Sequence, residues 1–130
     1  MSIERNKAVV RRFLDEVISQ GNLTVADEIL APNLRMYPPG SQEPLDREAF
    51  KRFLKGWRDG FPDMYDTIED LLAEEDKVVV RVTIRGTHEG EFQGMAPTGK
   101  KVMFAGFAIH RLAGGKILEF QAVNDRWSLM

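Results

Sequence analysis

The pattern of hydrophobic and polar positions changes once along this chain, near Pro62, from helical spacing to strict alternation. Before that point, apolar residues between Glu4 and Gln20 recur every three or four positions opposite a charged side, which predicts an amphipathic helix. Ser2 can cap the start of this helix, and Gly21 is placed to end it.

Two further helices are expected before Pro62. A short one follows a capping residue, Asn22 or Thr24, and closes at Pro32. A longer one begins after Asp46, ends near Gly60, and carries a stripe of large apolar side chains. That stripe consists of Phe50, Phe53, Leu54 and Trp57. Between these two helices, residues 34–37 suggest a short strand and residues 38–45 an irregular segment.

Everything after Pro62 alternates with the period of a β-strand. The expected strands span Tyr65 to Glu74, Lys77 to His88, Lys100 to Leu112 and Lys116 to Trp127. Turns at residues 75–76 and 114–115 and a long loop at residues 89–99 would join them. Helices first and strands afterwards predict an α+β fold in which helices cover one face of an antiparallel sheet. Because long strands twist and curl, we expect a strongly curved sheet that encloses a cavity with the helices.

Composition limits the classes of function. The chain of 130 residues is long enough for one domain, residues 1–130, with one sizeable core. A net charge of −2 provides no basic surface for nucleic acid, and no hydrophobic run is long enough for a membrane span. We therefore expect a cytoplasmic protein that binds neither nucleic acid nor a membrane. With no cysteine and two histidines, we expect no metal site and no cofactor.

The strand that ends at His88 provides the first candidate for chemistry. Carrying the alternation of Val82 and Ile84 forward places His88 on the same apolar face. An imidazole there could act as a base or donate a hydrogen bond to a substrate carbonyl. The alternative is that His88 bonds to the loop and holds residues 89–99 in place. His110, just before a turn, is expected at the surface.

Six segments of the chain carry a family resemblance. They are residues Asn6 to Val17, Gln20 to Leu23, Phe61 to Met64, Gly86 to Gly99, Gly114 to Glu119 and Asn124 to Met130. Together they resemble the SnoaL-like polyketide cyclases of the NTF2-like superfamily, over essentially the whole chain.

The resemblance implies a cone-shaped α+β barrel, in which three N-terminal helices pack on a strongly curved, mainly antiparallel sheet around an apolar pocket. It also implies a homodimer packed through the sheet. The implied reaction is ring closure by intramolecular aldol condensation, without metal or organic cofactor, with an aspartate as acid/base. That aspartate corresponds to Asp125 of this chain.

The residue pattern itself leaves two possibilities at the end of the last strand. If residues 114–115 form a two-residue turn, Asn124 faces the cavity and Asp125 faces away. The inward face would then also hold Ala105, Phe107, Ile109, Phe120 and Ala122. A β-bulge or a longer turn would reverse this and bring Asp125 inward, where apolar surroundings would raise the pKa of its carboxyl. Otherwise Asp125 caps the chain end or pairs with Arg126.

Aromatic side chains provide the expected ligand-binding surface. Phe13, Phe53 and Trp57 are placed to fill the core and also to line the pocket. Tyr37, beside the irregular 38–45 segment, could supply a phenolic donor at the rim.

A two-residue turn at 75–76 would determine which residues of the Tyr65 to Glu74 strand lie opposite the next strand. It sets Glu69 opposite Val82, which would be an unusual inward carboxylate, so the pattern favours a shifted register instead. On the other face it sets Asp70 opposite Arg81, an exposed cross-strand pair.

The leading hypothesis is a cofactor-independent enzyme that acts on an apolar, carbonyl-bearing small molecule. Asp125 would be the general acid/base, His88 a second acid/base or oxyanion partner, and Asn124 an orienting group. Epoxide hydrolysis or ketosteroid-type isomerisation is a second enzyme class on this fold, and two inward carboxylates would favour it. The non-enzymatic alternative is a dimer whose pocket binds a small ligand without reaction.

Overall fold

The first helical segment is continuous but changes type along its length. The computed structural model describes residues 2–124, beginning with the α-helix α1 (Ile3–Arg12) and the π-helix η1 (Phe13–Ser19). Ser2 caps α1, because its Oγ accepts a hydrogen bond from the backbone N–H of Arg5 at 3.1 Å. In η1 the hydrogen bonds reach five residues back, as from Gln20 N to Asp15 O at 3.1 Å. This wider helix is the part that buries Phe13 against the sheet.

Two further helices form after the predicted capping residues. Asn22 caps α2 (Leu23–Ile29), accepting from Val25 N at 3.2 Å. Asp46 caps α3 (Arg47–Gly60), accepting from Ala49 N at 2.8 Å. The strand β1 (Leu30–Tyr37) begins directly after α2, earlier than predicted, and includes Pro32. Because β1 is an edge strand, a residue without a backbone N–H is tolerated there.

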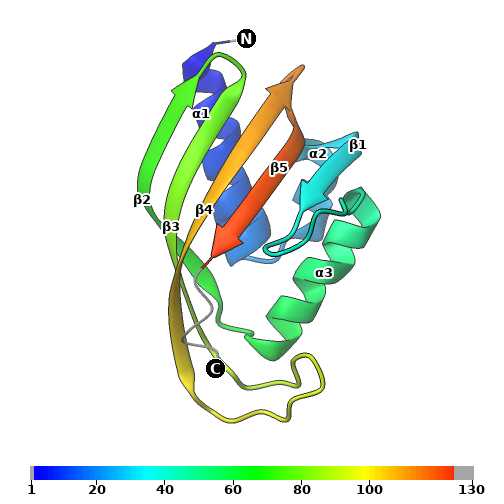
Figure 1. Ribbon diagram of the computed structural model, residues 1–130, viewed down its shortest axis with the longest axis vertical. Helices are drawn as coiled ribbons and strands as arrows, with labels where there is room; N and C mark the ends of the chain where they lie inside the picture. Colours follow the sequence, from blue (N-terminus) through cyan, green and yellow to red (C-terminus); the bar gives the residue numbers. More distant parts are fainter. Residues whose placement is uncertain (1, 125–130) are drawn as a thin grey trace.

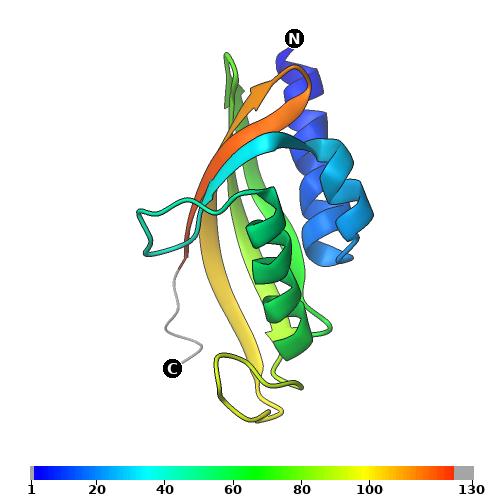
Figure 2. The same cartoon turned by 90° about the vertical axis from the view of Figure 1, so that its right-hand side faces the viewer.

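Five strands form one sheet in the order β1-β5-β4-β3-β2. The last four are β2 (Tyr65–Glu74), β3 (Lys77–Thr87), β4 (Lys101–Ala113) and β5 (Lys116–Asn124), and their pairings are antiparallel. β1 pairs with β5 in parallel, which the residue pattern did not reveal. The sheet curves strongly, and the helices cover its concave face (Figures 1 and 2). This arrangement confirms the predicted α+β class.

A β-bulge shifts the register between β2 and β3. Ile68 pairs with Val82 and Asp70 pairs with Arg81, which leaves Glu69 as the extra residue on β2. Glu69 is exposed, so the register is shifted, and Glu69 is not the inward carboxylate that unshifted pairing would give. The predicted pair on the outer face is confirmed, with Asp70 Oδ2 2.7 Å from Arg81 Nη2.

A second bulge lies beside the 114–115 turn. The turn has two residues, as expected, but the pairing of β4 with β5 shifts between Arg111 and Leu112. The inward residues of β5 therefore meet His110, Ala108 and Gly106. The inward positions predicted for Ala105, Phe107 and Ile109 are wrong, because all three are exposed on the outer face. His110 is not at the surface as predicted, since only 1% of it is exposed.

The core lies between the concave face and the helices. Its fully buried side chains include Val10, Phe13 and Val17 from the first helical segment and Val78 and Ile117 from the sheet. No helix within residues 2–124 is long and apolar enough to cross a membrane.

Candidate functional site

An apolar cavity of about 130 Å³ lies inside this core. Four of the residues predicted to bind a ligand line it: Phe13, Phe53, Trp57 and Asn124. Two titratable side chains also line it, Asp66 from β2 and His110 from β4. The cavity therefore combines a carbon-rich wall with very few polar groups, as small-molecule sites do.

The sheet register divides the lining into two ends. At what we call the aromatic end, His110 pairs with Phe120 near the 114–115 turn. At the polar end, Asn124 of β5 and Asp66 of β2 lie in successive inward-facing rows, two residues apart along the strands. Strands β4 and β3 lie between them in the sheet. The polar end is the one toward the lower part of Figure 1, where β2 begins and β5 ends.

His110 belongs to the packing of the aromatic end. Its ring stacks on Phe120, with centroids 5.3 Å apart, and meets the edge of Phe13 at 5.9 Å. Its Nδ1 lies 3.3 Å from the carbonyl oxygen of Val78, so Nδ1 must carry the proton. Burial lowers the pKa of His110 to about 4. The imidazole is therefore neutral at pH 7.

Asp66, at the polar end, was not among the residues predicted from the sequence. Its Oδ1 is buried and has no hydrogen-bond partner within the described part of the chain, while its backbone N–H donates to Ser19 Oγ at 2.9 Å. Burial raises the pKa of the Asp66 carboxyl to about 7, because the charged form loses its hydration.

One signal for Asp66 was present in the sequence. Asp66 precedes Ile68 by two positions, so β-alternation places both on one face. Counting pairs from the 75–76 turn pointed to Glu69 instead, since the bulge there cannot be read from the residues.

Asn124 lines the cavity, and its buried Oδ1 has no hydrogen-bond partner among residues 2–124. This confirms the inward position that the two-residue turn predicted for it. A β-bulge between β4 and β5 does occur, but Asn124 remains on the inward face of β5. The bulge changes instead which residues of β4 face the cavity. Asp125 itself lies outside the described residues.

His88 is buried but does not line the cavity. Its ring stacks on Phe61 at 5.3 Å, and its Nδ1 lies 3.0 Å from the hydroxyl oxygen of Thr98. Thr98 also accepts a hydrogen bond from the backbone N–H of Lys100 at 3.3 Å. His88 therefore bonds across the base of the 89–99 loop and is separate from Asn124.

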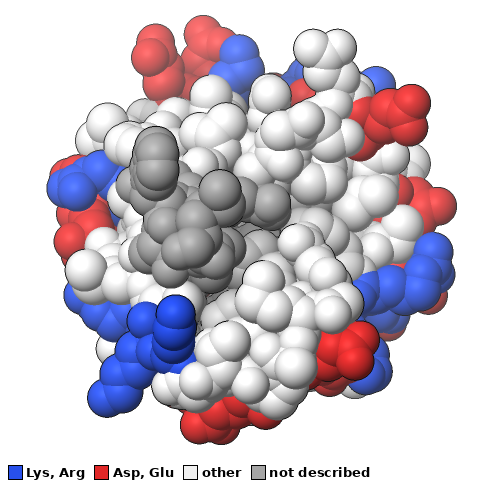
Figure 3. All heavy atoms as spheres, turned by 60° about the horizontal axis from the view of Figure 1, so that its bottom comes forward, with Lys and Arg blue, Asp and Glu red and all other residues white. Residues whose placement is uncertain are grey.

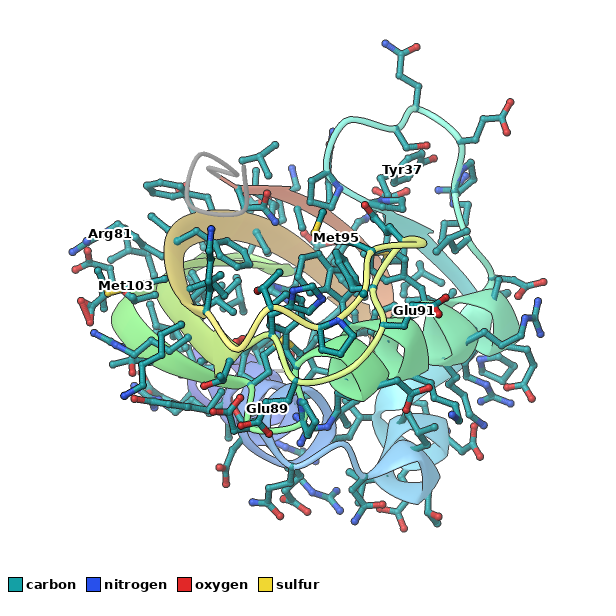
Figure 4. All side chains as sticks on the ribbon, turned by 90° about the horizontal axis from the view of Figure 1, so that it is seen from below. Tyr37, Arg81, Glu89, Glu91, Met95 and Met103 are labelled. Carbon is teal, nitrogen blue, oxygen red and sulfur yellow. The ribbon has the colours of Figure 1, made fainter. Side chains whose placement is uncertain are left out.

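The 89–99 loop is attached to the C-terminal end of α3. Gly60 O accepts from Glu89 N at 3.0 Å and from Gly90 N at 3.1 Å, and Phe92 packs on Trp57 at 4.5 Å. Figure 4 shows the loop, with Glu89, Glu91 and Met95, running across the lower end of the molecule. Since Trp57 lines the cavity, the loop supports the cavity wall from outside.

Tyr37 does not line the cavity, and lies at the end of β1 beside the 38–45 segment (Figure 4). Seen from near the lower end, the described residues around the centre of the surface are mostly uncharged, and acidic and basic side chains lie toward the margin (Figure 3). Within residues 2–124, no group of three or more His, Asp or Glu side chains is arranged to hold a metal ion.

Comparison with known proteins relates the whole chain to one family. The family model of SnoaL-like polyketide cyclases matches residues 8–130. A comparison with curated proteins found no significant match.

Solved structures agree with the family match. A provisionally assigned SnoaL-like polyketide cyclase from Jannaschia sp. CCS1 is 27% identical, with a TM-score of 0.91 over 100% of this chain and 92% of that one. AclR from Streptomyces galilaeus, provisionally assigned as a hydroxylase, is 26% identical, with a TM-score of 0.89 over 98% and 94% of the two chains. IdmH from Streptomyces antibioticus, provisionally assigned as a polyketide cyclase, is 27% identical, with a TM-score of 0.85 over 95% and 94%.

Proposed function

Because this chain belongs to the SnoaL-like polyketide cyclase family, we propose that it is a cofactor-independent enzyme that closes rings by intramolecular aldol chemistry. Its substrate would be an apolar small molecule with at least two carbonyl groups. The observation that supports this most directly is the cavity, which is apolar apart from a few polar side chains and has the unpartnered Asn124 Oδ1 at its polar end. Asp125, the acid/base that the family resemblance implies, is the next residue of the chain.

In the proposed reaction, the Asp125 carboxylate removes a proton from the carbon next to one carbonyl group. The enolate carbon then forms a bond to the second carbonyl carbon, whose oxygen becomes an alkoxide. The protonated Asp125 returns its proton to that alkoxide, which leaves the enzyme unchanged. Asn124 would orient the substrate through its side-chain amide. His88 would act through the 89–99 loop that it anchors rather than on the substrate.

The test uses heptane-2,6-dione and longer diketones, whose ring closure produces an absorbing cyclic enone after loss of water. We expect the native protein to accelerate closure and Asp125→Asn to lower kcat by about 100-fold or more. Asp70→Asn, on the outer face of β2, is the matched control and should retain activity. Closure no faster than in buffer across the series, or full activity of Asp125→Asn, would overturn the proposal.

Isomerisation of an unsaturated ketone or epoxide hydrolysis is the second candidate, because Asp66 adds an inward carboxyl to the same cavity. A cyclic ketone with a non-conjugated double bond distinguishes this candidate from the first. Conjugation of that double bond, lost in Asp66→Asn, would favour isomerisation. Tight binding without turnover of any of these compounds would favour a non-catalytic binding protein.

We also propose a homodimer that packs through the outer face of the sheet. Leu72, Phe107, Ile109 and Val123 are about half or more exposed on strands β2, β4 and β5. The register places Phe107 beside Val123, and Ile109 and Leu72 on either side of Val79. A continuous apolar surface of this kind is typical of protein–protein contacts.

A further inference from the structure

The polar end of the cavity holds a carboxyl oxygen that no contact within the described fold satisfies. Asp66 Oδ1 is buried without a hydrogen-bond partner, although Ser19 Oγ holds the backbone of the same residue at 2.9 Å. Buried polar atoms in native proteins are nearly always hydrogen-bonded. An acceptor that is fixed in position at a cavity wall is therefore placed to bind a molecule that enters the cavity.

The arginines of the segments next to Asp66 donate their hydrogen bonds to other groups. Arg58 Nη1 donates to the carbonyl oxygens of residues 18, 19 and 64, and its Nη2 donates to that of residue 62. Arg85 donates to the Thr67 hydroxyl at 3.1 Å, from the neighbouring position of β3. Among residues 2–124, only burial shifts the pKa of Asp66, and no charged group does. The carboxyl thus offers a hydrogen-bonding partner, and no cation of residues 2–124 shifts its pKa or marks it as a site for an anionic ligand.

The volume of the cavity limits the size of that ligand. An engineered protein cavity of about 150 Å³ binds benzene. The cavity here, of about 130 Å³, therefore accommodates a single six-membered ring, with Ile18, Ile84 and Phe104 among its apolar contacts.

We propose that Asp66 is a ligand-binding carboxyl that hydrogen-bonds the hydroxyl group of a neutral, single-ring molecule bound in this cavity. The ligand is phenol-like or enol-like, with an apolar ring against the cavity wall. This inference concerns binding and stands whether or not the bound molecule is turned over.

The test compares phenol with toluene, which has nearly the same shape and lacks the hydroxyl group. Binding of each to the full chain is measured by isothermal titration or ligand-observed NMR. Asp66→Leu removes the acceptor and keeps the side chain bulky. We expect it to weaken phenol binding about tenfold or more and to leave toluene binding equal or stronger. Retained toluene binding shows that the variant is folded and the cavity intact.

Two further variants complete the comparison. Asp66→Asn keeps an acceptor oxygen and should retain most of the phenol affinity. Asp70→Leu makes the same change on the outer face of β2 and should alter neither ligand. The proposal fails if Asp66→Leu changes phenol and toluene affinity by the same factor, or if neither compound binds the native protein. Turnover is measured separately with Asp125→Asn, so failure of the proposed function and failure of this inference give different results.

Discussion

Asp63 accepts two hydrogen bonds from Thr87, one from its backbone N–H at 2.6 Å and one from its hydroxyl at 2.7 Å. Two residues before Asp63, Phe61 stacks on His88. These contacts join the segment after α3 to the end of β3, two of the segments that carried the family resemblance. That junction fixes the base of the 89–99 loop against the helix that carries Trp57.

Replacing Asp63 should destabilise this junction. Thr87 lowers the pKa of the Asp63 carboxyl, first through its hydroxyl and then through its backbone N–H. A carboxyl whose folded pKa is below its unfolded value stabilises the fold above that unfolded value and loses the contribution as pH falls. We expect Asp63→Ala to cost about 1–2 kcal/mol at pH 7, since the group is largely exposed, and less near pH 3. Urea denaturation measures this, with Asp59→Ala as control, and equal stability of both variants would contradict it.

Asp66 should destabilise the fold as pH rises. Its folded pKa of about 7 is above the value of 3.8 expected when unfolded, so between these values only the folded chain holds the proton. Stability is therefore full at low pH and falls by up to about 4 kcal/mol as pH approaches 7. We expect Asp66→Asn to be more stable than the native protein at pH 8, with the difference shrinking toward pH 4. Chemical denaturation across this range checks it, and a difference independent of pH would contradict the raised pKa.

His110 should act in the opposite direction. Its pKa falls from 6.5 to about 4 on folding, so between these values only the unfolded chain binds the proton. Stability is lost as pH falls from about 6.5 to 4, by about 3 kcal/mol. Over the same pH range Asp66 adds stability as pH falls. The free energy of unfolding of the native protein should therefore change little between pH 6.5 and 4. His110→Phe, which keeps an aromatic ring beside Phe120, should gain stability relative to the native protein as pH falls. A constant offset between the two proteins would show that His110 titrates normally.

A charge on the outer face of the sheet should prevent the proposed dimer. Phe107 is 49% exposed at the centre of that face, so Phe107→Glu should leave the monomer folded while placing an unpaired charge in the contact. Sedimentation should show a dimer for the native chain and a monomer for this variant. Gln42→Glu adds the same charge in the 38–45 segment and should remain dimeric. A native monomer, or a dimeric Phe107→Glu, would refute the proposal.

Local patterns predicted most of the elements. The caps at Ser2, Asn22 and Asp46 and the alternation after Pro62 placed the helices and strands within a few residues. These features depend on neighbours in sequence, so the residues alone reveal them. The early start of β1 was missed because its pairing partner, β5, lies far along the chain.

The site was harder to predict, as Asp66 and His110 illustrate. Which side of the sheet a residue faces depends on every pairing between it and the nearest turn, and one extra residue reverses the result. Because of the bulge at Glu69, counting residue pairs from the 75–76 turn did not identify Asp66 as the inward carboxyl. The bulge beside Arg111 turned His110 into the core and Phe107 outward.

The sequence by itself determined the fold class, the family and the aromatic residues Phe13, Phe53 and Trp57 of the cavity wall, because hydrophobic spacing and capping act over a few residues. Only the tertiary structure decided which polar groups face the cavity. Strands distant in sequence curve around one cavity, and the resulting burial shifts the pKa of Asp66 and leaves Asn124 Oδ1 without a partner among residues 2–124.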